Sequence, residues 1–389
     1  MAKQQAPLNY LHPAARQFPW RSHNKVQLFI DGDTFYPEMI TRIDQATSSV
    51  MLEMYLVESG KIADEFIRCL LAAANRGVQV YLLFDAIGSM GFSKKDRKRL
   101  KISNIHLTFY NPLYMGRIRQ NFFRDHRKIL IVDQQIVFVG GAGITDDFIS
   151  SEAQKGWRET MVSVRGECLP DWVALFNSVW KIHSTKKIIL SETVDPDKGL
   201  SQTCRVVCAL GSQQSTKEGI KRSLVKRIRN AENRIWIATA YFLPSFKIRR
   251  ALVKAAQRGI DVRILLPGVH SDHPSIHYAG RRFYRRLLNA GVQIFEYESR
   301  FMHQKVLLCD QWVSIGSSNI DRWNFYWNLE ANLEVEDSIF SSQIETMLLQ
   351  DISDSNKCDI ATWKQRDLVS RFKEWFWGKV DKWLNRKIR

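Results

Sequence analysis

The chain of 389 residues lacks several features that would place a protein in a class at once. Its six cysteines form no C-x-x-C pair, and although Cys204 and Cys208 are four positions apart, no second pair completes a zinc site. No apolar run reaches the roughly 18 residues that a membrane span needs, and residues 1–7 lack the apolar core of a signal peptide. These absences predict free thiols in a reducing cytoplasm and a protein that neither spans a membrane nor is exported.

Acidic residues are also scarce relative to basic ones. The sequence has 40 acidic and 57 basic residues, which gives a formal net charge of +17. Such an excess favours an anionic partner, either nucleic acid or anionic lipid headgroups, and charge alone does not separate the two. The hydrophobic share of 45% and the length are enough for two domains of ordinary size.

One pattern, His-x-Lys-x-x-x-x-Asp, occurs twice, as His126-Arg-Lys128-Ile-Leu-Ile-Val-Asp133 and as His303-Gln-Lys305-Val-Leu-Leu-Cys-Asp310. A single His-x-Lys is usually a surface pair, but the doubled form points to a site that attacks a phosphodiester. The apolar runs inside the motifs predict short buried strands, on which His and Lys two positions apart share one face. The two aspartates, five positions past their lysines, point away from that face. We therefore interpret Asp133 and Asp310 as turn and anchoring members of the catalytic motifs.

A segment rich in small residues follows each motif: Gly140-Gly141-Ala142-Gly143 and Gly316-Ser317-Ser318-Asn319. If each motif strand folds back as a hairpin, these segments lie beside the histidine and lysine. Gly141 and Gly143 would then let the backbone approach a bound phosphate, with Ser317 and Asn319 as further donors. Glu159 and Glu330 offer one carboxylate per half, and either can bond the far ring nitrogen of a histidine and fix its tautomer.

The duplication extends beyond the motifs. Residues 73–83 resemble residues 255–265, and in both copies a helix with apolar spacing ends at Arg-Gly before a β-branched strand. Another strand lies upstream in each half, at Val50–Tyr55 and at Ile235–Tyr241, which predicts crossover units with a largely parallel sheet. Each half holds one histidine and one lysine of the site. The economical arrangement is a pseudo-twofold pair whose motifs meet in one active site at the interface.

The chain resembles the phospholipase D superfamily over about residues 26–360. The paired motifs, Gly-Ser-x-Asn after the second and Trp157-Arg158-Glu159 after the first carry the resemblance. Residues 27–36 and 303–330 look most like bacterial cardiolipin synthases, of the kind without N-terminal transmembrane helices. The resemblance implies an α/β fold of two α/β/α phospholipase D-like repeats with one shared active site. It also implies a mechanism without metal or cofactor, and phosphatidyl transfer.

The sequence departs from the family pattern at two positions. Gly143 stands where the family usually has Asn, so its side chain cannot donate to a phosphoryl oxygen, and a water or a neighbour such as Thr145 would substitute for it, or the halves have unequal roles. Glu159 stands where Asp is common, which keeps the charge and lengthens the reach.

The domain division that we predict has five parts: residues 1–25 as an N-terminal extension, 26–183 and 204–360 as the two phospholipase D-like domains, 184–203 as a polar linker, and 361–389 as a basic aromatic C-terminal helix. From Arg366 onward the chain has eight basic and three acidic residues, and four of the twelve tryptophans lie after residue 362. Such a helix suits the headgroup boundary of an anionic bilayer, although a helix packed on the domain body is the plainer alternative.

The mechanism that we predict has His126 attack phosphorus while His303 protonates the departing alkoxide, and pseudo-symmetry allows the reverse assignment. Lys128 and Lys305 would supply positive charge to the non-bridging oxygens. With the resemblance, the best-fitting reaction joins two phosphatidylglycerol molecules into cardiolipin and glycerol. A hydrolase releasing phosphatidic acid is the alternative, and a nucleic-acid phosphodiesterase or a non-enzymatic protein fits less well.

The expected partners are phospholipid substrates and an anionic membrane surface, with no nucleic acid. The expected location is peripheral, on the cytoplasmic face of the inner membrane. His270, His273 and His277 have a spacing that suggests a metal site, but Pro274 breaks a helix that would align them, so we predict a loop lining the entrance to the site. The arginine-rich residues 281–286 are most simply a solvated helix face.

Overall fold

The computed structural model describes residues 18–101, 104–116, 119–189, 199–210, 219–322 and 324–387. The chain forms two compact units. Unit 1 comprises residues 1–221, 315–318 and 323–336, and unit 2 comprises residues 222–314, 319–322 and 337–389. After entering unit 2, the chain therefore returns to unit 1 twice, and the second of these returning segments carries Glu330.

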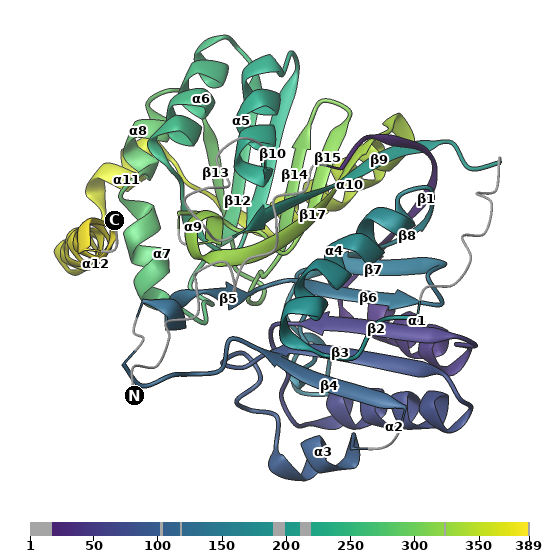
Figure 1. Ribbon diagram of the computed structural model, residues 1–389. Coiled ribbons are helices and arrows are strands. Elements are labelled where there is room, and N and C mark those ends of the chain that lie inside the picture. Colours follow the sequence, from purple (N-terminus) through teal and green to yellow (C-terminus); the bar gives the residue numbers. More distant parts are fainter. Residues whose placement is uncertain are drawn as a thin grey trace. The chain divides into compact units, whose positions relative to one another are not determined.

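The sheet of unit 1 follows the order β17-β9-β1-β8-β7-β6-β2-β3-β4, with β5 paired to β17 (Figure 1). The pairs β2–β3 and β3–β4 are parallel, and the pairs from β2–β6 onward to β9–β17 are antiparallel. The strands are β1 (Arg21–Ile30), β2 (Ser49–Met54), β3 (Gln79–Asp85), β4 (Ile105–Tyr110), β5 (Arg124–Asp125), β6 (Lys128–Val132), β7 (Ile136–Gly140), β8 (Thr160–Gly166), β9 (Gln202–Leu210) and β17 (Asn328–Glu336).

The sheet of unit 2 repeats part of this order, as β18-β13-β12-β10-β14-β15. The pairs β10–β12 and β12–β13 are parallel, and β10–β14 is antiparallel, as in the matching strands of unit 1. The strands are β10 (Arg234–Thr239), β12 (Asp261–Pro267), β13 (Gln293–Tyr297), β14 (Lys305–Cys309), β15 (Trp312–Gly316) and β18 (Ser355–Lys357), with β11 (Phe242–Leu243) and β16 (Ile320–Asp321) forming a separate pair. The largely parallel sheet that the sequence predicted is thus mixed, because each motif strand enters antiparallel.

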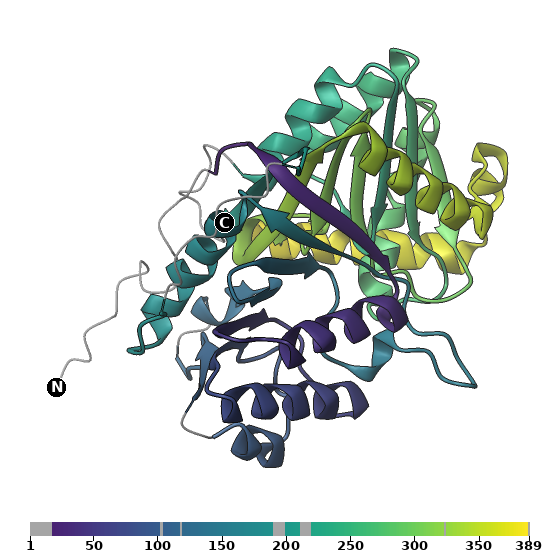
Figure 2. The ribbon, with the colours of Figure 1, turned by 90° about the vertical axis from the view of Figure 1, so that its right-hand side faces the viewer.

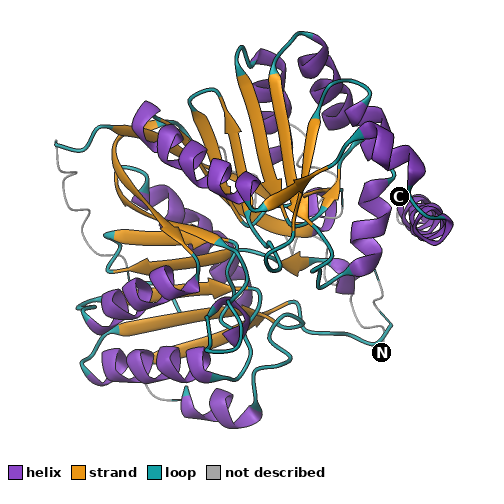
Figure 3. Cartoon of the chain, turned by 180° about the vertical axis from the view of Figure 1, so that it is seen from behind, coloured by secondary structure: helices purple, strands orange, loops and turns teal. Residues whose placement is uncertain are grey.

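Helices cover both faces of the strands in each unit (Figure 3). In unit 1, α1 (Gly32–Asp44) and α2 (Lys61–Asn75) run side by side (Figure 2), and their apolar faces join Leu52 and Leu82 in one buried core. The alternation of strand side chains turns Tyr81 to the opposite face, where its ring lies 5.4 Å from that of Trp180 on α4 (Leu169–His183). Unit 1 also contains α3 (Lys94–Arg99), and α9 (Asn324–Trp327) precedes β17.

Unit 2 carries the other helices: α5 (Ile220–Asn230), α6 (Phe246–Gln257), α7 (Pro274–Arg281), α8 (Tyr284–Leu288), α10 (Ser338–Ser353), α11 (Ile360–Gln365) and α12 (Leu368–Lys387). The predicted helix ends are confirmed in both halves: α2 and α6 stop at Arg76 and Arg258, and the following Gly77 and Gly259 have φ of 95° and 88°. That left-handed conformation is one that glycine adopts without strain.

Two features of the predicted division look different in the structure. β9 (Gln202–Leu210), which spans the predicted start of the second domain at residue 204, pairs with β1 and β17 inside unit 1. The predicted C-terminal helix is two helices, because the α-helical run breaks at Arg366–Asp367. Residues 1–17 of the predicted extension and 190–198 of the predicted linker lie outside the described residues. Among the helices of the described ranges, none combines the length and apolar character needed to cross a bilayer.

Candidate active site

His126 lies between β5 and β6 of unit 1, and backbone pairing brings a distant carboxylate to it. β5 pairs in parallel with β17, with Leu329 opposite Asp125. The backbone N–H of His126 then donates to the carbonyl of Leu329 at 2.9 Å. Because Glu330 follows Leu329, this pairing sets its side chain beside the imidazole.

The contact between Glu330 and His126 fixes the imidazole. Nδ1 of His126 lies 3.0 and 3.2 Å from the two carboxylate oxygens, and the Glu330 side chain is fully buried. Ser317 donates its hydroxyl proton to the same carboxylate and accepts from the Ala331 N–H at 3.1 Å. With Nδ1–H donating to Glu330, the lone pair of His126 lies on Nε2. The arrangement suits a neutral imidazole nucleophile.

Lys128 and Tyr55 complete the surroundings of His126. The ammonium of Lys128 turns back and donates to the carbonyl of His126 at 2.7 Å, 5.0 Å from the centre of the Tyr55 ring. The Tyr55 ring in turn lies 4.7 Å from the imidazole. Burial raises the pKa of Tyr55 to about 12, so its hydroxyl stays protonated at neutral pH. Tyr55 was visible in the sequence only as the end of a strand.

His303 in unit 2 has a similar environment. Lys305 donates to the His303 carbonyl, as Lys128 does to His126, and its ammonium also lies 2.8 Å from Nδ1 of the ring. The rings of Tyr241 and Phe301 lie 6.5 and 5.7 Å from the imidazole. Each motif therefore folds its lysine back onto its own histidine beside an aromatic ring, which is the local symmetry that a duplication predicts.

Asn319 is held by its carbonyl end. Its Oδ1 accepts from the Tyr241 N–H at 3.3 Å and lies 3.4 Å from the hydroxyl of Thr239. This fixed orientation suits the predicted role of its amide as a donor to a phosphoryl oxygen.

The loop with the spaced histidines contacts the same region. The hydroxyl of Tyr241 donates to Asp272, and the ring of His273 lies 5.8 Å from that of Tyr241. The prediction of a loop holds up to His273 and fails beyond it, because Pro274 occupies the first turn of α7, where its missing N–H costs nothing. In the described residues no group of His, Cys, Asp or Glu is arranged to hold a metal ion.

The aspartates of the two motifs anchor backbone, as their strand parity indicated. Asp133 accepts N–H donors from Thr47, Ser48 and Ser49 at 2.8–2.9 Å. Asp310 accepts from the three corresponding N–H groups, of residues 232–234, at 2.9–3.0 Å. Partial burial raises the pKa of Asp133, but its N–H donors outweigh this, and the net shift is downward.

The two glycines of the first motif are closely approached by their neighbours. A Cβ on Gly141 would lie 2.3 Å from the carboxylate of Glu159, and one on Gly143 would lie 2.7 Å from Cβ of Leu56. A side chain at position 143 would therefore meet the backbone and Cβ of Leu56, which leaves no room for the asparagine of the second half, and a side chain at position 141 would displace the Glu159 carboxylate. Thr145, a possible substitute for the missing asparagine, donates its hydroxyl to Glu58 at 2.9 Å, which directs it away from that role.

Most of the chain matches a known protein family. Residues 39–180 and 224–352 match the family model described as cardiolipin synthase, PLD-like domain. The chain belongs to this phospholipase D-like family. It is 30% identical over 359 residues to the probable cardiolipin synthase YwiE of Bacillus subtilis, covering 91% of this chain and 71% of that protein. It is also 30% identical over 378 residues to a cardiolipin synthase of a Geobacillus species, covering 96% of this chain and 75% of that protein.

Solved structures with low sequence identity support the fold. The crystal structure of phosphatidylserine synthase from Haemophilus influenzae has a TM-score of 0.70 at 13% identity and covers 93% of both chains. Polyphosphate kinase from Porphyromonas gingivalis has a TM-score of 0.59 at 14% identity, over 87% of this chain and 49% of that one. The mixed α/β fold with two phospholipase D-like segments is thereby confirmed.

A buried ionic network beside His126 distinguishes the two halves of this family member. Arg127 lies 3.2 Å from Glu53, and Arg124 lies 3.2 Å from Asp85, all of them buried. Burial raises the pKa of Asp85 to about 6 and that of Asp125 well above its usual range. Sequence reasoning missed these residues, because charged side chains on a predicted buried strand give no local sign of their partners.

The second half replaces this network by apolar or neutral residues. Met54 pairs with Lys128 in the first half, and Thr239 pairs with Lys305 in the second. These pairings show which strand positions of the two halves are equivalent. In that register the counterparts are Ala238, Pro267, Phe301, Met302 and Gln304. The local charge around the first histidine is therefore a feature of the first half alone.

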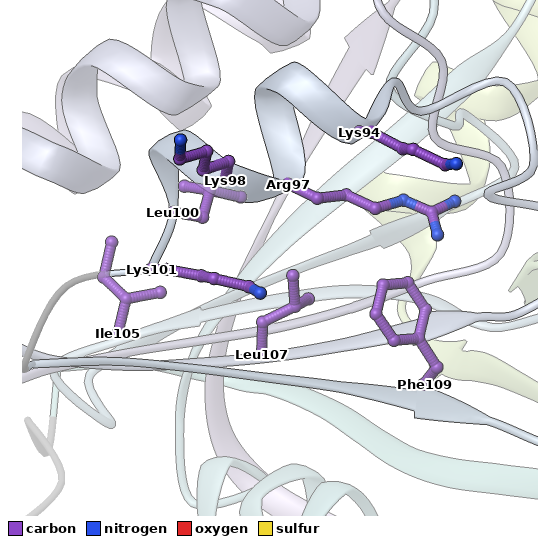
Figure 4. Close-up of a pocket in the computed structure, with 8 residues that line it drawn as sticks. All are labelled: Lys94, Arg97, Lys98, Leu100, Lys101, Ile105, Leu107 and Phe109. Carbon is purple, nitrogen blue, oxygen red and sulfur yellow. The ribbon is translucent and has the colours of Figure 1, made fainter.

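One cavity of the described residues lies away from both motifs. It has a volume of about 770 Å³ and is bounded by α3 and β4 of unit 1 (Figure 4). Basic side chains line one wall and apolar side chains the other, and Arg97 lies 4.9 Å above the Phe109 ring. None of the predicted site residues lines it.

Proposed function

We propose that this protein is a cardiolipin synthase that transfers a phosphatidyl group between two phosphatidylglycerol molecules. The observation that carries the proposal is the Ser317–Glu330–His126 chain, because a carboxylate at Nδ1 favours the tautomer whose lone pair on Nε2 could attack phosphorus. Membership of the cardiolipin synthase family supports the choice of lipid substrate over other phosphodiesters.

The first half-reaction forms a phosphatidyl-histidine. Nε2 of His126 attacks phosphorus, the bond from phosphorus to the glycerol headgroup oxygen breaks, and His303 gives its proton to that oxygen, so glycerol leaves. In the second half-reaction a glycerol hydroxyl of another phosphatidylglycerol gives its proton to His303 and attacks phosphorus. The N–P bond breaks, cardiolipin leaves, and both histidines return to their starting states.

This scheme requires that both histidines act on one phosphorus atom, so we propose that the two motifs form one shared site. Lys128, Lys305 and Asn319 would stabilise the charge that grows on the non-bridging oxygens. By the symmetry of the repeat, Glu159 would support His303 as Glu330 supports His126. The carboxylate contact of His126 supports its assignment as the nucleophile.

The proposed setting is peripheral, at the cytoplasmic face of an anionic membrane where phosphatidylglycerol resides. The net charge of +17 supports attraction to such a surface. We expect no nucleic acid among the partners.

Mass spectrometry of the products tests the proposal. Purified protein receives phosphatidylglycerol alone, then with phosphatidylethanolamine, and in parallel a labelled oligonucleotide. Cardiolipin and glycerol in equal amounts from phosphatidylglycerol alone are the expected products. Phosphatidic acid without cardiolipin would indicate a hydrolase, and oligonucleotide cleavage without a lipid product would indicate a nuclease. Either outcome contradicts the proposal.

A further inference from the structure

The last helix, α12, buries its acidic residues and exposes its large apolar side chains, which is the reverse of an ordinary surface helix. In a globular protein the apolar stripe of a surface helix faces the core and the charged stripe faces water. On α12 the buried positions are Glu374, Gly378 and Asp381, spaced by four and three residues along one face. The large apolar side chains lie on the other face: Leu368, Val369, Phe372, Trp375, Phe376 and Trp383 are 43–77% exposed.

Two buried carboxylates hold the inner face of α12 against unit 2. Glu374 pairs with Arg366 at 2.6 Å and with Arg281 at 3.5 Å. Asp381 pairs with Arg282 and with Arg322, the latter at 2.7 Å. Each acid thus lies between two arginines. The prediction of a solvated face for residues 281–286 is therefore wrong for Arg281 and Arg282, whereas Arg285 and Arg286 are exposed.

Close approach of the backbone confirms that this face is built for contact. Arg282 donates to the carbonyl of Gly378, and a Cβ on Gly378 would lie 3.0 Å from the Arg282 side chain. α12 packs against α7, which carries Arg281, and Figure 1 shows α12 end-on and α7 lengthwise. The plainer alternative, a helix packed on the domain body, is therefore half right: α12 does pack on the body, but through its acids, and its aromatic face stays outside.

The outer face combines aromatic and cationic groups. Lys379 lies 5.8 Å from the Trp375 ring, and Lys373 lies 5.2 Å from the ring of Tyr278 on α7. Of the three acidic residues that follow Arg366, two are the buried Glu374 and Asp381, so the exposed charge of α12 is almost wholly positive. An exposed apolar patch rimmed by cations is complementary to an anionic lipid surface and repels a second basic copy of this chain.

We propose that the outer face of α12 is a docking surface for an anionic phospholipid bilayer. The aromatic side chains enter the boundary between headgroups and acyl chains, and the lysines contact the headgroup phosphates. The inference rests on the proposed function only for the reason why the protein would need a bilayer, since none of the residues that form the surface is catalytic. The Arg322–Asp381 pair joins α12 to the segment after Asn319, so the docked helix is tied to the loop of the second motif.

Vesicle co-sedimentation of the full chain tests the proposal. The variant Phe372→Ser/Trp375→Ser/Phe376→Ser is compared with the matched control Ile339→Ser/Leu349→Ser, which removes exposed apolar residues of α10 in the same unit. Vesicles contain phosphatidylglycerol and phosphatidylcholine, or phosphatidylcholine alone. Turnover of the water-soluble bis(p-nitrophenyl) phosphate reports on the catalytic site.

We expect the triple variant to bind phosphatidylglycerol vesicles at least about tenfold more weakly, with turnover of the soluble substrate unchanged and the control binding like wild type. Binding of the triple variant equal to wild type would overturn the proposal. So would a wild-type dimer that the triple variant loses, because the face would then be a contact between copies. Strong binding of wild type without any cardiolipin product would instead refute the proposed function and leave the docking surface intact.

Discussion

The carboxylates around the motifs show how one residue type takes different roles through its contacts. Asp133 and Asp310 bind only backbone and neighbouring groups on the turn before a strand, whereas Glu330 binds an imidazole and a serine hydroxyl. The aspartate role followed from strand parity within one motif. Strand parity did not show which histidine Glu330 contacts, because that contact depends on the pairing of β17 with β5, which lies about two hundred residues earlier in the chain.

Replacing Asp133 should lower stability more than it lowers catalysis. Asp133→Ala leaves three N–H groups without their acceptor, which costs about 2–4 kcal/mol of unfolding free energy. The folded pKa is below the usual value, so this stabilisation is present above about pH 4 and disappears as the pH falls through the folded pKa. Urea unfolding at pH 7 and at pH 3 measures it.

Asp310→Ala is the matched variant in the second half and should behave alike. Loss of turnover of a soluble phosphodiester in a variant that remains folded, with unchanged unfolding free energy, would contradict the anchoring role.

Glu330 should act on catalysis through His126. Glu330→Gln removes the carboxylate that holds Nδ1–H, so kcat should fall at least about a hundredfold with little change in KM, and Glu330→Asp should restore part of it. Glu334→Gln on the same strand, which loses a partner of Arg205, is the control. Single-turnover rates of phosphoenzyme formation provide the measurement, and a Glu330→Gln variant as fast as the control would refute the role.

At the scale of elements, the sequence predicted the repeated units best where the signal is local. The helix ends at Gly77 and Gly259 and the motif strands β6 and β14 follow from glycine conformation and apolar runs. The orientation of α12 did not follow from its sequence alone. Its periodicity gave one aromatic and one charged face, but the pairing with Arg281, Arg282 and Arg322, which lie far away in the sequence, decides which face is buried.

The end of α4 should make unit 1 sensitive to acid. Burial lowers the pKa of His183 to about 4, and its ring packs 5.0 Å from that of Tyr110. His183 is protonated near pH 6.5 in the unfolded chain but only near pH 4 in the folded chain. Stability is thus complete above pH 6.5 and is lost as the pH falls through this window, by up to about 3 kcal/mol.

The variant His183→Phe should flatten that loss, because phenylalanine keeps the ring contact without the titrating group. His23→Gln, at a half-exposed histidine, is the control. Thermal melts between pH 4 and pH 7 measure both, and an acid sensitivity of His183→Phe equal to wild type would contradict this account.

At the scale of the whole molecule, duplication explains why the family could be recognised from the sequence. Both halves keep the lysine that returns to its histidine's carbonyl, the anchoring aspartate and the aromatic neighbour. The halves then diverge: the first has a buried ionic network and two crowded glycines, and the second has Ser317 and Asn319. This divergence favours unequal roles for the two histidines. The proposed mechanism requires that both histidines act on the same phosphorus atom.

The number of covalent adducts per chain tests that requirement most directly. The protein is mixed with phosphatidylglycerol, quenched with base within one turnover, and digested for mass spectrometry, since a phosphohistidine survives alkaline conditions. We predict one phosphatidyl group per chain, on the peptide that contains His126, absent from His126→Ala and formed more slowly by His303→Ala. Two adducts per chain, or single variants that both keep more than a tenth of wild-type activity, would contradict a shared site.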